Sequence, residues 1–536
     1  MVTGAPAHQL EDEAWPEVSE PSPANTQIDL RAAPGPNRRN ALRLGGLVGV
    51  AFLLRFVPLG YQSVWEDEAY TLALAQRSFG GMLHLFRFEA NGLLYSLIVW
   101  PLVRIDQSTF VLRAPALAAG VAAVPALWWA GRGLVGRRGA LFAAWLLAAS
   151  PMAVYYSQEA RAYSFVVLFS ILGWGCLDRA LREGGRRWWL LYAITLAGAM
   201  YANGLAPLML VPAQAVLVIA YGRKGLRAWA LALAGAAALA APITLLLVVE
   251  SGHRNPLYWL GSPGIGQVLA AVRELVVGGG SGVRITTITR VAAVLFVVLA
   301  AWVVLAGVRR GPSSPGLKAV CAWALVPLPL AVVLSYLHPI LLARYEIEAL
   351  PGAMLALGGL LARMRGRLRV VAFLGLGAVS LVAVARQSTV TIKADFRSAT
   401  TWMAERRQPG DPVLVDPLLR LPGLGYYDRS LRAADGRLVV AEWGDAPLPV
   451  GVVGLEDPGG ITDAPPGPPT ARFVADLLRR TGRLFIVSAP TTRRQGAIST
   501  GAALRWTHEH CSVATKPVRL MTVWEISGCR TASAHP

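Results

Sequence analysis

Residues 41–62 read ALRLGGLVGVAFLLRFVPLGYQ and are followed, two residues later, by Trp65-Glu66-Asp67-Glu68-Ala69. The first stretch is long enough to cross a bilayer, because a spanning helix needs about 20 mostly apolar residues. We therefore expect three consecutive carboxylates just outside one face of a membrane. Such neighbours raise one another's pKa and cost stability, so the cluster indicates a base or a cation site. A solvated acidic loop is the alternative interpretation.

The composition fixes the class of protein. Of 536 residues, 54% are hydrophobic and only 15% are charged, whereas charged residues make up about 25% of a soluble protein. This predicts an α-helical polytopic membrane protein. The net charge of +19 would suggest nucleic acid binding in a soluble chain. Here the basic residues lie in short loops between apolar runs, so we expect membrane lipids and no nucleic acid as partners. Nearly all of them are arginine, since lysine occurs only at positions 224, 318, 393 and 516.

Eleven apolar segments are candidate spans, and the loops between them alternate in charge. One set of loops is rich in arginine, and the other carries acids, tyrosine, tryptophan and histidine. By the positive-inside rule the arginine-rich loops are cytoplasmic, which puts the N-terminus inside and the C-terminus outside the cytoplasmic membrane. The spans cover residues 42–62, 111–131, 139–154, 163–181, 187–202, 205–221, 228–248, 290–307, 318–336, 344–361 and 369–385.

The acidic cluster then belongs to the first outer loop, residues 63–110. Within this loop, residues 79–105 are apolar but are interrupted by His84, Arg87 and Glu89. We predict helices that lie along the outer interface, because counting this stretch as a crossing would invert every later loop.

Two segments flank the membrane domain, which we assign to residues 38–386. Residues 1–37 are rich in proline and acids and are expected to form a disordered cytoplasmic tail. Residues 387–536 predict a small extracytoplasmic α/β domain. Its elements are a helix at 395–408, a strand at 412–415, a helix at 470–481, a strand at 484–487 and a strand pair near 518–526.

Cys511 and Cys529 lie 18 positions apart in this outer domain. Oxidation is permitted outside the cytoplasm, so we expect them to form a disulfide. The adjoining His508-Glu509-His510-Cys511 has ligand-like side chains, but a strand would put only some of them on one face. We predict no metal site there.

Several short motifs, by their order and topological placement, resemble the GT-C superfamily. Within it they resemble the family of protein O-mannosyltransferases and the lipid A aminoarabinose transferase, over about residues 42–430. The motifs are the Asp67-Glu68 pair after the first helix, Leu112-Arg113-Ala114-Pro115, Tyr156-Ser157-Gln158-Glu159-Ala160-Arg161-Ala162-Tyr163, Arg344-Tyr345 followed by Ala349-Leu350-Pro351, and Asp395-Phe396-Arg397.

This resemblance implies a GT-C fold and the transfer of a hexosyl or pentosyl group. The donor would be a polyprenyl-phosphate sugar and the acceptor a glycan, lipid or protein at the outer membrane face. The family's acidic pair maps onto Asp67 and Glu68, with Asp67 as the general base. The substrate cleft is expected to include Glu66, Asn91, Tyr95, Glu159, Tyr163 and Tyr345. Many members read His-Pro-Pro-Leu where this chain reads Asn91-Gly92-Leu93-Leu94, which leaves the acceptor open.

The residues support the same chemistry from first principles. Displacing a phosphate from an anomeric carbon needs a base for the incoming hydroxyl and positive charge on the departing oxygens. Arginine supplies that charge through its planar, bidentate donors. The candidates are Arg161 and Arg344, at outer ends of helices, and Arg55 inside the first span. Snorkelling or an ion pair with a nearby acid is the alternative for each. No cofactor is predicted, and a divalent cation is left open.

Two rival classes are weighed against the transferase. A transporter or flippase of a lipid-linked or cell-envelope substrate would have its site near the membrane midplane, at broken helices in paired repeats. This sequence has no internal repeat and an odd number of candidate spans. A sensor with a working outer domain would not need eleven spans as its anchor.

The predicted topology can be tested by labelling introduced cysteines. A cysteine at Gly136, in an arginine-rich loop, should be accessible only from the cytoplasm, and a cysteine at Gly459 only from outside. Labelling of both positions from the same side would contradict the eleven-span topology.

Overall fold

The computed structural model describes most of the chain. The described residues are 38–86, 92–222, 225–253, 263–278, 287–308, 315–440, 447–454, 471–488 and 500–529. The predicted tail, residues 1–37, lies outside them. Residues Met1–Arg43 form one compact unit and Leu44–Pro536 form a second, which contains the helices from Leu44 of α1 onward and the sheet.

The membrane domain consists of helices with short connections. In chain order they are α1 (Arg38–Phe56), α2 (Glu66–Ala75), α3 (Phe79–Leu85), α4 (Leu93–Leu102), α5 (Thr109–Leu134), α6 (Gly136–Ala148), α7 (Pro151–Tyr156), α8 (Tyr163–Glu183), α9 (Arg186–Ala202), α10 (Ala206–Ala220), α11 (Leu226–His253), α12 (Ile265–Val277), α13 (Thr287–Val308), α14 (Pro315–Leu325), α15 (Pro327–Ser335), the 3₁₀ helix η2 (Ala343–Ala349), α16 (Leu350–Arg363) and α17 (Gly366–Thr389).

Every predicted span coincides with a helix or a pair of consecutive helices. Among the described residues, five helical segments are long and apolar enough to cross a membrane: Thr109–Leu134, Tyr163–Glu183, Leu226–Val249, Gly316–Ser335 and Gly366–Thr389. In residues 79–105, α3 and α4 have only 7 and 10 residues. Each is shorter than the about 20 residues that a crossing needs, and their placement along the outer interface stays a prediction. The predicted boundary at 386/387 falls inside the last turns of α17.

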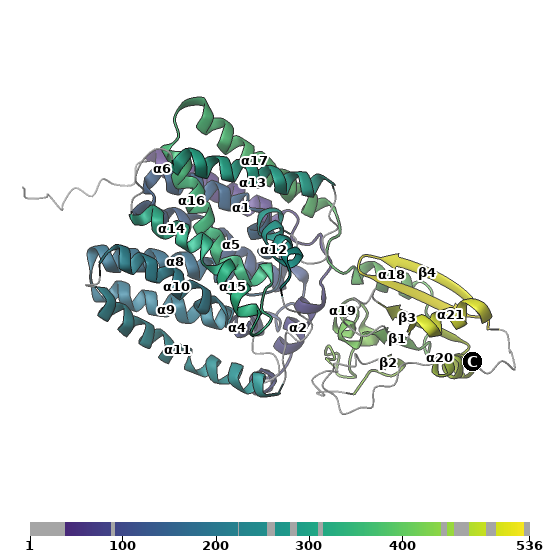
Figure 1. Ribbon diagram of the computed structural model, residues 1–536. Coiled ribbons are helices and arrows are strands. Elements are labelled where there is room, and N and C mark those ends of the chain that lie inside the picture. The colour runs from purple at the N-terminus through teal and green to yellow at the C-terminus, as the bar shows by residue number, and fades with distance from the viewer. Residues whose placement is uncertain are drawn as a thin grey trace, which may run out of the picture. The chain divides into compact units, whose positions relative to one another are not determined.

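Small residues set the spacing of the bundle, in which α8 packs between α5 and α9 and α6 packs on α16 (Figure 1). A Cβ added to Gly358 of α16 would lie 2.4 Å from the carbonyl oxygen of Gly139 in α6. Such close approach is typical of membrane helices, where van der Waals contact and not water exclusion drives association. Between α8 and α14, the buried rings of Trp174 and Trp323 stack with centroids 4.6 Å apart.

The C-terminal domain, which we call the outer domain after the side that the sequence predicts for it, follows α17 and is built on one mixed sheet of five strands in the order β2-β1-β3-β5-β4. Strands β2 (Val452–Gly454), β1 (Val413–Asp416) and β3 (Arg483–Ser488) are parallel, and β5 (Met521–Ser527) runs antiparallel to β3 and β4 (Ser512–Val518). Side chains alternate across the sheet, so both faces carry apolar residues. Helices α18 (Phe396–Ala404) and α19 (Leu421–Tyr427) cover one face, and α20 (Ala471–Thr481) and α21 (Thr500–His510) cover the other (Figure 1).

The predicted elements of this domain are found, but others were missed. Sequence reasoning did not predict the short strand β2 or the helices α19 and α21, and the His508-Glu509-His510 stretch is the end of α21 and not a strand. The ring of His510 stacks on Trp506, four residues earlier, which is the spacing of one helical turn. Cys511 and Cys529 are joined by a disulfide that ties the end of α21 to the end of β5.

Candidate active site

The acidic cluster forms the first turn of α2, with Glu66 as its first residue. Negative charge is favourable there, because the amide groups of a helix N-terminus carry partial positive charge. Successive residues of an α-helix are about 100° apart around its axis. Glu66, Asp67 and Glu68 therefore point in three directions and meet three different partners.

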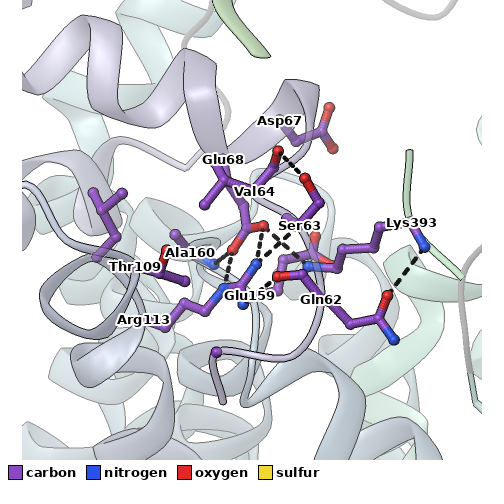
Figure 2. A network of polar contacts seen from close by, with 12 residues as sticks. Gln62, Ser63, Val64, Asp67, Glu68, Thr109, Arg113, Glu159, Ala160 and Lys393 are labelled. Carbon is purple, nitrogen blue, oxygen red and sulfur yellow. Dashed lines mark hydrogen bonds and ion pairs between the residues drawn. The ribbon is translucent and has the colours of Figure 1, made fainter. Parts of the chain in front are cut away.

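Glu68 points inward and is fully buried. Arg113 of α5 binds it through two parallel hydrogen bonds, from Nε to Oε1 and from Nη2 to Oε2, both 2.7 Å long. The backbone N–H of Ala160 also donates to Oε1, at 2.8 Å. The remaining donors of Arg113 bind the carbonyl oxygens of Leu59, Gln62 and Ser63, which lie in the loop before α2 (Figure 2). The pair fixes both ends of that loop.

Lys393, in the linker between α17 and α18, adds a second cation to this group. Its Nζ lies 3.2 Å from Oε2 of Glu68 and 3.2 Å from Oε2 of Glu159. Both carboxylates are fully buried, and the lysine side chain is only 2% exposed. Two acids and two bases thus form a buried, charge-balanced cluster of Glu68, Arg113, Lys393 and Glu159, which we call the charge cluster.

Asp67 differs from its neighbour because it lies at the edge of this cluster. Its carboxylate is 27% exposed and Oδ2 lies 3.4 Å from Nη1 of Arg344 in η2, whose side chain is 20% exposed. The Nε of Arg344 is buried and has no hydrogen-bond partner among the described residues. A carboxylate and a guanidinium with few hydrogen bonds therefore lie next to each other, and both side chains are partly exposed.

Glu66 points toward the outer domain. Its Oε1 lies 2.8 Å from Nη1 of Arg420, just before α19. On the same side, the hydroxyl of Tyr427 accepts a hydrogen bond of 2.7 Å from the backbone N–H of Val64. Arg397 of α18 adds a hydrogen bond of 3.1 Å from its Nη2 to the carbonyl oxygen of Gly60, so the outer domain contacts the loop before α2 and its first turn at several points.

The buried acids differ in their pKa values because their charged neighbours differ. Burial alone would raise the pKa of Glu68, but Arg113 and Lys393 outweigh burial and lower that pKa to about 2. The pKa of Glu159 is raised by burial, with Glu68 and Asp67 adding to the effect against Lys393 and Arg344. Glu274 of α12 accepts a hydrogen bond from the hydroxyl of Tyr156 at 3.3 Å. Burial raises the pKa of Glu274 to about 7.

Arg55, one of the three predicted phosphate-binding arginines, is fully buried and engaged elsewhere. Its Nε donates to Ser157 at 3.1 Å, and Nη1 donates to the carbonyl oxygens of Ala51 and Ala148 at 3.0 Å. These bonds connect α1, the end of α6 and the turn that carries Glu159. We therefore assign Arg55 a structural role.

The remaining predicted residues are dispersed around the site. Arg161 lies in the turn before α8, two residues from Glu159. Tyr345 is buried with its ring 5.6 Å from the guanidinium of Arg344, and the buried ring of Tyr163 packs edge-on against Tyr156. Tyr95 is buried and donates to the carbonyl of Leu112 at 2.6 Å, so it links α4 to α5. Asn91 lies outside the described residues.

Sequence reasoning missed two members of the charge cluster. Arg113 was part of a noted motif but was given no role, and Lys393 was overlooked. One signal could have identified each: Arg113 is a charged residue inside a predicted span, and Lys393 is one of four lysines in a chain of arginines. Among the described residues, no group of three or more His, Cys, Asp or Glu side chains is arranged to hold a metal ion.

The comparisons with known proteins concern the family and the fold. Residues 91–247 match the family model described as dolichyl-phosphate-mannose-protein mannosyltransferase. No curated protein is significantly similar to the chain in sequence. ArnT from Cupriavidus metallidurans, solved with bound undecaprenyl phosphate, superposes with a TM-score of 0.57 at 15% identity, over 90% of this chain and 97% of that chain. AglB from Archaeoglobus fulgidus, an oligosaccharyltransferase solved with an inhibitory peptide and a dolichol-phosphate, gives a TM-score of 0.51 at 11% identity, over 92% of this chain and 74% of that chain.

The charge cluster predicts unequal effects of two isosteric changes on stability. Glu68→Gln leaves Arg113 and Lys393 incompletely paired, and breaking a buried ion pair typically costs about 3–5 kcal/mol. Asp67→Asn, at the neighbouring and partly exposed position, should have a much smaller effect. Thermal unfolding in detergent compares the two variants, and equal melting temperatures would contradict the structural role of Glu68.

Thermal unfolding measured at falling pH provides the matching control for Glu68→Gln. The folded-state pKa of Glu68 is lowered from 4.5 to about 2, so its stabilising effect is complete above pH 4.5 and is lost as the pH falls toward about 2. Over that window Glu68→Gln should lose less stability than the wild type.

Proposed function

We propose that the chain is a membrane glycosyltransferase of the GT-C superfamily, which moves a sugar from a polyprenyl-phosphate donor to an acceptor at the outer face of the cytoplasmic membrane. The observation that carries this proposal is the pairing of Asp67 with Arg344. Both are partly exposed, whereas Glu68 beside them is completely enclosed. The alternation of loop charge supports the orientation, with the N-terminus inside and the outer domain outside.

The proposed reaction is an inverting displacement at the anomeric carbon. A hydroxyl of the acceptor attacks this carbon, the bond from carbon to the phosphate oxygen breaks, and the electron pair leaves with the phosphate. The proton of the hydroxyl passes to the carboxylate of Asp67. Arg344, whose side chain is 20% exposed, can offer its Nη atoms to the phosphate, which gains charge as it departs.

Two structures of similar fold support a lipid phosphate as the leaving group. The ArnT structure contains undecaprenyl phosphate and the AglB structure contains a dolichol-phosphate. For the present chain we propose the same chemical class of donor. The acceptor, a glycan, a lipid or a protein, and the identity of the sugar are not part of the proposal.

The general base is tested by Asp67→Asn. The amide cannot take up the acceptor proton, so turnover should fall by about 10²–10⁴. The measurement is the release of polyprenyl phosphate by purified protein supplied with a panel of polyprenyl-phosphate sugars. Asp476→Asn, at an exposed position of α20, is the matched control and should be unaffected. Turnover of Asp67→Asn near that of the control would show that Asp67 is not the base.

The phosphate site is tested by binding without turnover. Arg344→Ala should weaken the binding of free polyprenyl phosphate about ten- to a hundredfold, because a hydrogen bond to a charged group contributes about 1.5–3 kcal/mol. Arg344→Lys should restore only part of the affinity, since a point charge cannot reproduce the bidentate fork. Arg161→Ala is expected to weaken binding as well, whereas Asp67→Asn should bind nearly normally.

The exposed Arg429 of the outer domain provides the control for the loss of a positive charge. If Arg344→Ala and Arg161→Ala both bind the lipid as tightly as Arg429→Ala, the phosphate is held by other residues.

A further inference from the structure

Lys393 is an unusual residue in this chain. Lysine is rare here, and this one is buried although its segment joins a membrane helix to the outer domain. Its ammonium group also lies 5.3 Å from the ring centroid of Tyr155 and 5.7 Å from that of Trp65. Aromatic faces attract a cation and exclude water from it. A long, flexible side chain is thus held in one place by two carboxylates and two rings.

The backbone at Lys393 is held as firmly as the side chain. Gln62, in the loop before α2, accepts hydrogen bonds from the N–H groups of Ile392 and Lys393 at 3.1 and 3.4 Å. Its amide nitrogen donates to the carbonyl oxygens of Gln387 and Val390 at 3.0 and 2.8 Å. One glutamine therefore clamps the linker against the loop that leads into the acidic cluster.

The charge count explains why a cation is needed at this point. Arg113 balances Glu68 through two direct hydrogen bonds, which leaves Glu159 without a guanidinium of its own. Lys393 supplies the balancing charge for Glu159. Without it, a buried carboxylate would lie uncompensated close to Asp67 and Arg344, the two groups that the proposed reaction uses.

We propose that Lys393 is a positioning residue for the reaction. Its ammonium neutralises Glu159, which keeps Arg344 available for Asp67 and the donor phosphate, and it holds the first turn of α2 against the linker. The inference rests on the proposed function for its consequence on turnover. The part of the inference that concerns the structure, the hold of Lys393 on α2, does not depend on the proposed function.

The group whose charge state Lys393 controls is Glu159, and its surroundings define the expected pH effect. Glu159, in the turn between α7 and α8, faces Glu68 and Asp67 of α2, Lys393 of the linker, Arg344 of η2 and Glu274 of α12. Removing the ammonium takes a positive charge from this set. Glu159 should then protonate at higher pH, because loss of a nearby cation disfavours its charged form.

The test uses the full chain with three variants and one control. Lys393→Met keeps most of the side-chain volume and removes the charge, and Glu159→Gln removes the opposite charge without changing shape. The double variant Lys393→Met/Glu159→Gln restores the balance. Lys516→Met, in an exposed position of β4, is the matched control for the loss of a lysine. Turnover is expressed per folded molecule, as judged by size-exclusion chromatography.

Lys393→Met should lower turnover by about 10²-fold, since displacing catalytic groups by about 1 Å can cost that much. The acidic limb of its pH–rate profile should move to higher pH. The double variant should recover much of the rate, and its acidic limb should return toward that of the wild type. A role in packing alone would not move the limb. Turnover of Lys393→Met equal to that of Lys516→Met, or a double variant as slow as Lys393→Met, would overturn the inference.

A second measurement separates this inference from the proposed function. Hydrogen exchange of the backbone amides of α2 should be faster in Lys393→Met than in the wild type and Lys516→Met, and slower again in the double variant. This readout needs no substrate. If the wild type transfers no sugar from any donor, the proposed function fails while exchange still decides the positioning role. Unchanged exchange in Lys393→Met would refute the hold on α2.

Discussion

The charge cluster is the interaction on which the outer side of this molecule depends. Glu68 comes from α2, Arg113 from α5, Glu159 from the turn before α8 and Lys393 from the linker to the outer domain. A buried charge is costly unless it is paired and hydrogen-bonded, so each of the four requires the others to be in place. The outer domain is therefore coupled to the membrane helices through the same ions that fix the acidic turn.

The adjacency of Asp67 and Glu68 follows from this arrangement. One residue must face inward to complete the buried cluster, and helical geometry then rotates its neighbour toward the edge. The inward carboxylate accepts four hydrogen bonds and its pKa is lowered to about 2. It is a poor base, because it binds a proton only in strong acid. The outer carboxylate has one long contact, to Arg344 at 3.4 Å. An acidic pair in sequence thus becomes one anchor and one accessible group.

The sequence was sufficient for the elements of the fold and insufficient for their contacts. Long apolar runs and loop charges are local signals, so they predicted the helices of the candidate spans, the short helices within residues 79–105 and most of the C-terminal sheet, but not α12, α19 or α21. The end of α21 was misjudged because a polar tetrapeptide has no period of its own. Neither Lys393 nor Arg113 could be assigned, since the partner of a buried ion is set by the tertiary fold. Lys393 and Glu68 are 325 positions apart.

Arg55 shows why a charged residue in a span is not by itself a binding site. An ionisable residue within the membrane is expected to be functional by default, but here the guanidinium is used by Ser157 and by carbonyl oxygens at the end of α6. A Cβ on Gly120 of α5 would lie 1.9 Å from the hydroxyl of Ser157, so that glycine allows the contact. Gln158 donates to the carbonyls of Leu54 and Arg55 and fastens the same turn. Arg55 thereby holds the turn that carries Glu159, as Arg113 holds the loop that carries Glu68. The two fully buried arginines support the site from within the helices, whereas Arg344 is partly exposed beside Asp67, and this difference in exposure is why the proposed function assigns the substrate phosphate to Arg344 and not to Arg55.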